Sequence, residues 1–156
     1  MSCCLFIVLE RGMRDFRSSV ESVIIKNHPR WESGMDVTIL LGSSSDLPIA
    51  QKCTKILEHF DVPYQLRVAS AHRSPKFVEQ IVGDALDDGC SVFIAMAGLA
   101  AALPGAVAAL TTKPVIGVPC GGRVPYDSLL SIAQLPPGVP AATGRCRPWR
   151  QRWLPR

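Results

Sequence analysis

The feature that most constrains the fold is an alternation of short apolar runs with longer segments of helical spacing. The run at 92–97 is apolar without alternation, as expected of a strand covered on both faces. Strands that alternate with helices form right-handed crossovers and a parallel sheet between helix layers. The sequence therefore predicts an α/β fold, a three-layer α/β/α sandwich with a parallel sheet. The expected strands are 37–41, 64–68, 92–97 and 114–118, with a possible last strand ending near Thr143.

The segments between these runs predict four helices. In the first, Ser45 or Asp46 is the expected N-cap, and one apolar face recurs at helical spacing, comprising Ile49, Cys53, Ile56, Leu57 and Phe60. In the second, Ser74 is the expected cap and Pro75 the first residue. Its apolar face comprises Phe77, Ile81 and Ala85, with Val78 and Leu86 nearby. An alanine-rich helix reaching about Leu110 and a short helix over 127–134 complete the set.

The chain of 156 residues is long enough for one domain with one core. Residues 1–34 have no clear period, and Met35 stands just before the first convincing strand. Two interpretations stay open, a real N-terminal extension or upstream sequence joined to a domain that starts at Met35, and we favour the second. We therefore expect an α/β domain over 35–143.

The net charge of +4 is unevenly distributed along the chain. Residues 1–34 carry +1, residues 35–144 carry −2, and residues 145–156 carry +5. The central region lacks the basic footprint of a duplex binder, although it can still hold a phosphate locally. The basic tail, with two tryptophans, could bind single-stranded nucleic acid by charge and stacking, but we favour a disordered or mistranslated tail. We expect no nucleic-acid partner.

The six cysteines show no pair at zinc-ligand or redox spacing, so we expect reduced, mostly buried thiols. No stretch approaches the roughly 18 apolar residues of a membrane span. The apolar run at 3–9 has no basic residue before it and no small-residue cleavage site after it, so we expect no secretory signal. The expected protein is soluble and cytoplasmic, with no membrane partner.

A candidate site lies at 70–75, between the second strand and the second helix. His72 can give and take a proton near neutral pH, and Arg73 can grip a phosphate with two bonds. Backbone amides and the helix dipole at such a turn favour an anion. Because ligands gather where the carboxyl ends of parallel strands meet helix starts, we expect the loops beginning at Gly42, Ser70, Gly98 and Pro119 to converge on one crevice.

These loops resemble those of a known family, the N5-carboxyaminoimidazole ribonucleotide mutases of purine biosynthesis, or PurE. The motifs follow the family's order across roughly 110 residues. They are Gly42-Ser43-Ser44-Ser45-Asp46, Ser70-Ala71-His72-Arg73, Ala97-Gly98 with Leu103-Pro104-Gly105, Pro114-Val115-Ile116-Gly117-Val118-Pro119, and Asp127-Ser128-Leu129-Leu130-Ser131-Ile132 followed by Gln134 and Pro137-Gly138-Val139-Pro140.

The resemblance implies a flavodoxin-like sandwich, often a homo-octamer, that moves a carboxylate from N5 of an aminoimidazole ribonucleotide to C4. It implies neither a metal ion nor an organic cofactor. By similarity His72 is the catalytic acid/base, Arg73 matches the phosphate and Asp46 the ribose hydroxyls. The other expected substrate-binding residues are Gly42, Ser43, Ser45, Ser70, Ala71 and Gly98.

The chain departs from the family at two places. Many bacterial mutases carry Gly-Gly-Ala-Ala-His before Leu-Pro-Gly, whereas this chain has Gly98-Leu99-Ala100-Ala101-Ala102 and so lacks a second family histidine. Residues 144–156 form an atypical basic tail in place of the family's C-terminal helix. Three alternatives remain: direct carboxylation by carbon dioxide, a nucleotide-phosphate binding module without turnover, and carboxylation of a different heterocycle, as in pincer-cofactor biosynthesis.

The same residues also have purely structural interpretations. Alone, His72 would be a surface histidine beside a helix start, and Ser43 to Asp46 would be a capping turn. Arg73 would pair with a surface carboxylate, a weak interaction. Tight packing and pocket lining are equally good explanations of the small residues from Gly98 to Gly105. Cys120 and Arg123 match nothing specific and receive no role.

Overall fold

The computed structural model describes residues 37–121 and 126–144. The expectations for residues 1–34, for Arg123 and for the tail after Gly144 lie outside the described residues. The strands are β1 (Val37–Leu41), β2 (Tyr64–Val68), β3 (Val92–Ala97), β4 (Val115–Pro119) and β5 (Ala142–Thr143). The helices are α1 (Leu47–His59), α2 (Pro75–Asp87), α3 (Ala102–Ala108) and α4 (Asp127–Ala133), with a 3-10 turn η2 (Ser44–Asp46) before α1.

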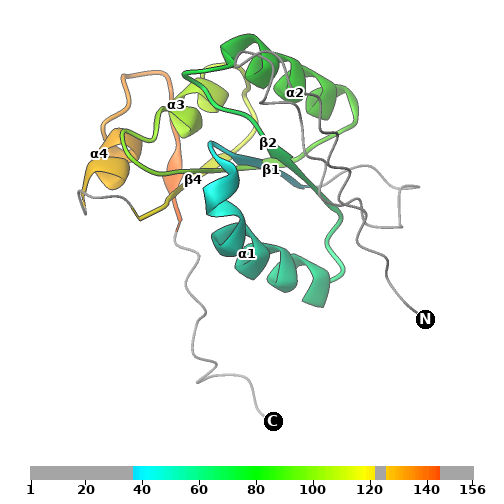
Figure 1. The fold of residues 1–156 in the computed structure, drawn as a ribbon. Coiled ribbons are helices and arrows are strands. Elements are labelled where there is room, and N and C mark those ends of the chain that lie inside the picture. Colours follow the sequence, from blue (N-terminus) through cyan, green and yellow to red (C-terminus); the bar gives the residue numbers. More distant parts are fainter. Residues whose placement is uncertain (1–36, 122–125, 145–156) are drawn as a thin grey trace, which may run out of the picture.

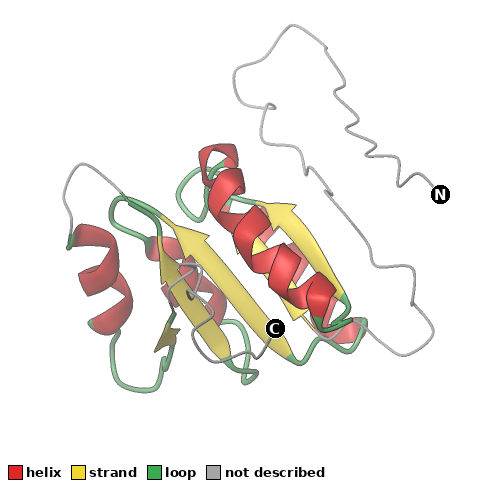
Figure 2. Ribbon diagram, turned by 90° about the horizontal axis from the view of Figure 1, so that it is seen from below, coloured by secondary structure: helices red, strands yellow, loops and turns green. Residues whose placement is uncertain are grey.

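All five strands form one parallel sheet in the order β2-β1-β3-β4-β5. Val37 pairs with Tyr64 on one side and with Val92 on the other, so β1 is an interior strand although it comes first in the chain. This order is that of flavodoxin-like folds, in which ligands bind where the strand order reverses, between β1 and β3. Figure 2 shows the strands running side by side, with one long helix in front of the sheet and other helices behind it. The predicted flavodoxin-like sandwich is confirmed.

The sheet separates two apolar layers (Figure 1). On one face α1 packs through Ala50 against Ile39 and Leu66. On the other face α2, α3 and α4 share a core with Leu40 and Phe93, to which they contribute Val78, Ile81, Val82, Ala85, Leu103, Val107, Ala108 and Ile132. Successive side chains of a strand point to opposite faces, which is why Ile39 and Leu40 belong to different layers.

Two details of α1 and α2 differ from the expectation. The apolar face of α1 is buried only in part, because Ile56 is 51% and Phe60 66% exposed. The expected caps occupy the correct positions, but neither Asp46 nor Ser74 makes a side-chain capping bond. The Ser74 hydroxyl instead donates to the Ser70 carbonyl at 3.2 Å.

The thiols within the described ranges agree with the expected chemistry. Cys90 and Cys120 are buried, Cys53 is partly buried, and none of the three forms a disulfide. Among residues 37–121 and 126–144, no helix is long and apolar enough to cross a membrane.

Candidate active site

A pocket of about 830 Å³ opens at the carboxyl edge of the sheet. This volume lies in the range of small-molecule sites. The segments that line it follow β1, β2, β3 and β4, so the four loops expected to converge do contribute to one hollow. All nine residues predicted from the sequence are in its wall: Gly42, Ser43, Ser45, Asp46, Ser70, Ala71, His72, Arg73 and Gly98. Their individual roles remain predictions.

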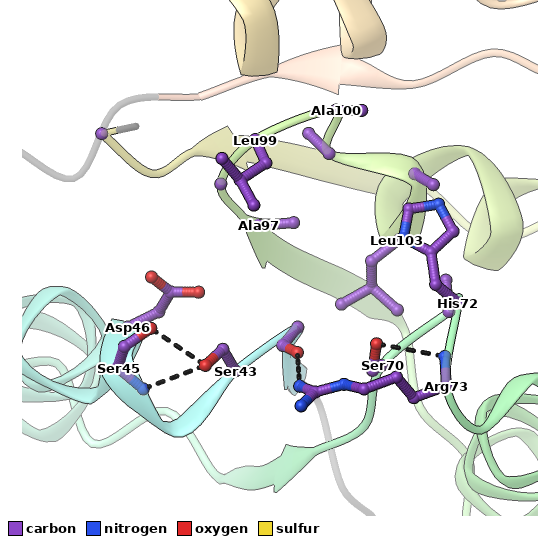
Figure 3. A pocket seen from close by; sticks show the side chains of 16 residues that line it. Ser43, Ser45, Asp46, Ser70, His72, Arg73, Ala97, Leu99, Ala100 and Leu103 are labelled. Carbon is purple, nitrogen blue, oxygen red and sulfur yellow. Dashed lines mark hydrogen bonds between the residues drawn. The ribbon is translucent and has the colours of Figure 1, made fainter. Parts of the chain in front are cut away.

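The first wall is the turn from β1 into α1. The Gly42 N–H donates to the Met96 carbonyl at 2.9 Å, and a Cβ at this glycine would lie 3.4 Å from that of Ala97. The close approach holds the turn against β3. The Ser43 hydroxyl accepts from the Ser45 amide at 3.3 Å and from the Ser45 hydroxyl at 2.9 Å (Figure 3). This local capping and ligand binding are compatible, and they leave Asp46 at the start of α1.

The second wall is the turn from β2 into α2. Ser70 is buried, and its Oγ accepts from the Arg73 amide at 3.4 Å while its carbonyl accepts from the Ser74 amide at 2.9 Å. Arg73 reaches across to the first wall, where its Nη2 donates to the Gly42 carbonyl at 3.4 Å. His72 is exposed and lies on the opposite side of the pocket from Asp46 (Figure 3).

The third wall is an apolar turn between β3 and α3. Leu99 and Ala101 have positive φ values of 50° and 28°, a region that side chains other than glycine seldom adopt. The Ala101 amide donates to the Gly98 carbonyl at 3.0 Å, which closes the turn. Packing and pocket lining are equal explanations of the small residues from Gly98 to Gly105 when the sequence alone is considered. In the structure, residues 98–103 line the pocket.

Seven lining residues were not among the predicted site residues. They are Ala97, Leu99, Ala100, Ala101, Ala102, Leu103 and Gly121. None carries an ionisable or strongly polar side chain, so chemistry alone could not single them out. The only available signal was the run of small residues after β3, which permits close approach of a ligand.

The carboxyl group of Asp46 is the perturbed charge of the pocket. Burial raises its pKa above the ordinary value, and a hydrogen bond with the Cys120 side chain acts in the opposite direction. The two effects have clear physical causes, since burial disfavours the charged carboxylate and a donor stabilises it. Asp46 is thus a partly desolvated carboxyl group in the wall of the pocket.

The pocket therefore combines three kinds of group. A guanidinium beside the N-terminus of α2 favours a phosphate, hydroxyls and a carboxylate favour a sugar, and one imidazole can transfer a proton. Within the described part of the chain, no group of three or more His, Cys, Asp or Glu side chains could hold a metal ion.

Comparisons with known proteins agree with this combination. The family model described as AIR carboxylase matches residues 36–146. The chain is 56% identical over 108 residues to the N5-carboxyaminoimidazole ribonucleotide mutase of Methanocaldococcus jannaschii, covering 69% of this chain and 67% of that protein. It is 50% identical over 109 residues to the mutase of Pyrococcus abyssi, covering 69% of this chain and 63% of the relative.

A solved structure shows the same fold. The crystal structure of Treponema denticola PurE superposes with a TM-score of 0.64 and 31% sequence identity, covering 70% of each chain. The matched region thus spans about two thirds of the length of these relatives. With a family model that matches most of the chain and relatives at about half identity, the chain belongs to the AIR carboxylase family.

Proposed function

We propose that this protein transfers a carboxylate within a purine precursor, converting N5-carboxyaminoimidazole ribonucleotide to 4-carboxy-5-aminoimidazole ribonucleotide. The observation that carries the proposal is the pocket itself, which gathers all nine residues predicted from the sequence in a chain of this family. Relatives from several organisms, Methanocaldococcus jannaschii, Pyrococcus abyssi and Aliivibrio fischeri among them, bear the name of this mutase.

Substrate binding follows from the charges of the first two walls. The Arg73 guanidinium, beside the N-terminus of α2, holds the phosphate. The Asp46 carboxylate accepts hydrogen bonds from the ribose hydroxyls, and the Ser43 and Ser45 hydroxyls contribute further polar contacts. Binding of the phosphate and of the ribose orients the heterocycle at the other end of the ribonucleotide toward the remaining wall.

His72 supplies both proton transfers. Its imidazolium protonates N5, the N5–C bond of the carbamate breaks, and carbon dioxide is released while the electron pair stays on nitrogen. The electron-rich C4 then attacks carbon dioxide and forms the new carbon–carbon bond. The neutral imidazole removes the C4 proton, which restores aromaticity and the imidazolium. Atoms and charges balance with one histidine.

The apolar third wall suits the carbon dioxide intermediate. Ala101 and Leu103, each 2% exposed, offer no hydrogen-bond donor or nucleophile from their side chains. A small neutral molecule released beside them stays next to C4, because apolar side chains offer water no hydrogen-bond partner and so do not favour its entry. The wall therefore acts by positioning and exclusion.

The test is interconversion of the two carboxylated nucleotides by the purified protein, followed by ultraviolet absorbance and chromatography. A His72→Asn variant should lose about 10²- to 10⁴-fold in rate, the usual contribution of general acid–base catalysis. His59→Asn is the matched control, because His59 lies exposed at the far end of α1 and outside the pocket. A folded protein without conversion, or an active His72→Asn variant, contradicts the proposal.

Direct carboxylation by carbon dioxide is the second candidate. It is favoured by the family's description as AIR carboxylase and by a Candida glabrata relative, named phosphoribosylaminoimidazole carboxylase, that is 49% identical over 109 residues. Incubation of aminoimidazole ribonucleotide with ¹³C-labelled bicarbonate separates the two reactions, because only direct carboxylation starts from the uncarboxylated nucleotide. Calorimetric binding without any conversion would instead identify a binding module.

A further inference from the structure

The turn between β2 and α2 starts and ends in the core. Ala69, which directly follows β2, is fully buried, and its N–H donates to the Leu41 carbonyl at 2.8 Å. On the other side, Val78 in the first part of α2 is buried as well. His72 and Arg73 lie between these two buried positions and are exposed. Packing therefore does not hold them, and their placement depends on the hydrogen bonds of the turn.

Three hydrogen bonds close this turn, and all of them end on Ser70. The Ser70 hydroxyl accepts from the Arg73 amide at 3.4 Å (Figure 3). The Ser70 carbonyl accepts from the Ser74 amide at 2.9 Å and from the Ser74 hydroxyl at 3.2 Å. A carbonyl oxygen has two lone pairs, so both are used here. Ser74 thus binds Ser70 through its backbone and its side chain, across His72 and Arg73.

The Ser74 hydroxyl does not serve as the helix cap that its position suggests. A serine directly before a helix commonly accepts a hydrogen bond from an amide of the first turn. Ser74 makes no such side-chain bond, and the amides of Phe77 and Val78 donate to its carbonyl instead, at 3.1 and 3.2 Å. Its hydroxyl therefore contributes to the turn before α2 and not to the helix.

We infer that Ser74 is a positioning residue, whose hydroxyl holds the turn closed and thereby sets where the His72 imidazole and the Arg73 guanidinium lie. Ser74 does not line the pocket, so it acts through these two neighbours. The inference rests on the proposed function for the reaction and the ligand. The closed turn does not, because its hydrogen bonds are formed within the protein alone.

The other contacts of Arg73 are too long to fix the turn by themselves. Its amide lies 3.4 Å from the Ser70 hydroxyl, and its Nη2 lies 3.4 Å from the Gly42 carbonyl. Both distances exceed the usual 2.7–3.2 Å of an N–H···O bond, so both bonds are weak. The bond from the Ser74 hydroxyl is shorter and partly buried, where water competes less with it.

A looser turn would disturb both side chains at once, because they are adjacent in the chain. Figure 3 shows them leaving the turn in different directions, with Arg73 directed toward the first wall. A general acid must lie within about 2.6–3.2 Å of the atom it protonates, and a displacement of about 1 Å can lower a rate strongly. Loss of order in the turn should therefore lower kcat through His72 and raise KM through Arg73.

The experiment compares side chains that differ in the hydroxyl group at position 74. Ser74→Ala removes the hydroxyl, while Ser74→Thr keeps it. Ser74→Val has the shape of threonine without the donor, so the threonine and valine variants form a second pair if alanine disturbs folding. Ser131→Ala is the matched control, because the partly buried Ser131 hydroxyl also donates to the carbonyl four residues earlier, that of Asp127, at 2.9 Å. Ser131 lies in α4 and outside the pocket.

Three quantities are measured for each variant. By NMR on the unliganded protein, the amides of Arg73 and Ser74 should exchange hydrogen about two- to tenfold faster in Ser74→Ala and Ser74→Val, the range of one hydrogen bond. The kcat/KM for the ribonucleotide and the affinity for ribose 5-phosphate in calorimetry should each fall by a similar factor. Ser74→Thr should resemble wild type in all three. Ser131→Ala should lower the urea midpoint without changing any of them.

Two results would overturn the inference, provided that the alanine and valine variants are folded by circular dichroism. One is amide exchange at wild-type rates. The other is faster exchange with unchanged kcat, KM and affinity for ribose 5-phosphate, which would make the bond purely structural. If wild type shows no carboxyl transfer but exchange and phosphate affinity change as expected, the positioning role stands and the proposed function fails. The two ideas are therefore tested separately.

Discussion

Replacement of Gly117 by alanine should destabilise the protein, although it adds a single methyl group. Gly117 is buried in β4, and a Cβ there would lie 2.7 Å from Cγ2 and 3.1 Å from Cδ1 of Ile132 and 3.1 Å from Cβ of Pro104. Ile132 belongs to α4 and Pro104 to α3. The first distance is shorter than any real Cβ contact, so at least one of the two helices must shift.

The magnitude follows from what those neighbours can do. Ile132 is 1% exposed and Pro104 is buried with a rigid ring, so neither can rotate into solvent. Overpacking of this kind costs about 1–3 kcal/mol. With a urea dependence of about 1–3 kcal/mol per molar, the unfolding midpoint should fall by about 1 M.

Gly83→Ala is the matched control. Gly83 lies in the exposed face of α2, and a Cβ there meets no atom within 4 Å. Alanine in a helix interior stabilises by about 0.5–1 kcal/mol relative to glycine, so this variant should move the midpoint upward. Urea unfolding followed by circular dichroism compares the two. A Gly117→Ala variant as stable as wild type would refute the claim that β4, α3 and α4 leave no room at this position.

Three further predictions concern the pocket and the core. Arg73→Ala should weaken ribonucleotide binding by about ten- to hundredfold in calorimetry. Arg73→Lys should recover only part of the affinity, because an ammonium group cannot form the bidentate hydrogen bonds of a guanidinium. Thr38→Val should cost about 1–3 kcal/mol in urea unfolding, because it leaves the buried Gln65 Nε2, now 3.0 Å from Thr38 Oγ1, without that acceptor. Burial and the hydrogen bond to Glu58 raise the pKa of Tyr64 from 10.0 to about 12. The folded state therefore keeps the proton of the Tyr64 hydroxyl to a higher pH than the unfolded chain does. That stabilisation is complete below pH 10 and disappears as the pH rises toward 12, and Tyr64→Phe should flatten this part of the stability profile.

The sequence predicted the strands well because buried parallel strands have a strong compositional signal. The predicted run 37–41 coincides with β1, and 92–97 coincides with β3. These segments are apolar on both faces and are bounded by polar or glycine-containing turns, so their limits do not depend on tertiary context. The parallel sheet and its helix layers then follow from connectivity.

Helix faces and caps were predicted less well, because they depend on what lies opposite. Ile56 and Phe60 continue the apolar stripe of α1, but at that end of the helix the sheet no longer covers them. Ser74 has the residue type and position of a cap, yet its hydroxyl donates a hydrogen bond to the Ser70 carbonyl instead. A local pattern contains no information about which of two nearby partners is better placed.

The candidate site was predicted where it has polar groups and missed where it has none. His72, Arg73 and Asp46 were identifiable from their chemistry and from the family motifs. The contact between the Arg73 Nη2 and the Gly42 carbonyl joins the loops after β2 and β1, which are distant in sequence, so only the three-dimensional arrangement brings it out.

The twisted backbone after β3 has a consequence for engineering. Leu99 and Ala101 hold φ angles of 50° and 28°, and each left-handed residue of this kind costs about 1–2 kcal/mol that glycine would not. Relief of this backbone strain would therefore raise the free energy of unfolding. Glycine at position 99 or 101 would relieve this strain, but it would also make the backbone of a turn that lines the pocket more flexible, so the gain in stability would come with a less rigid pocket wall.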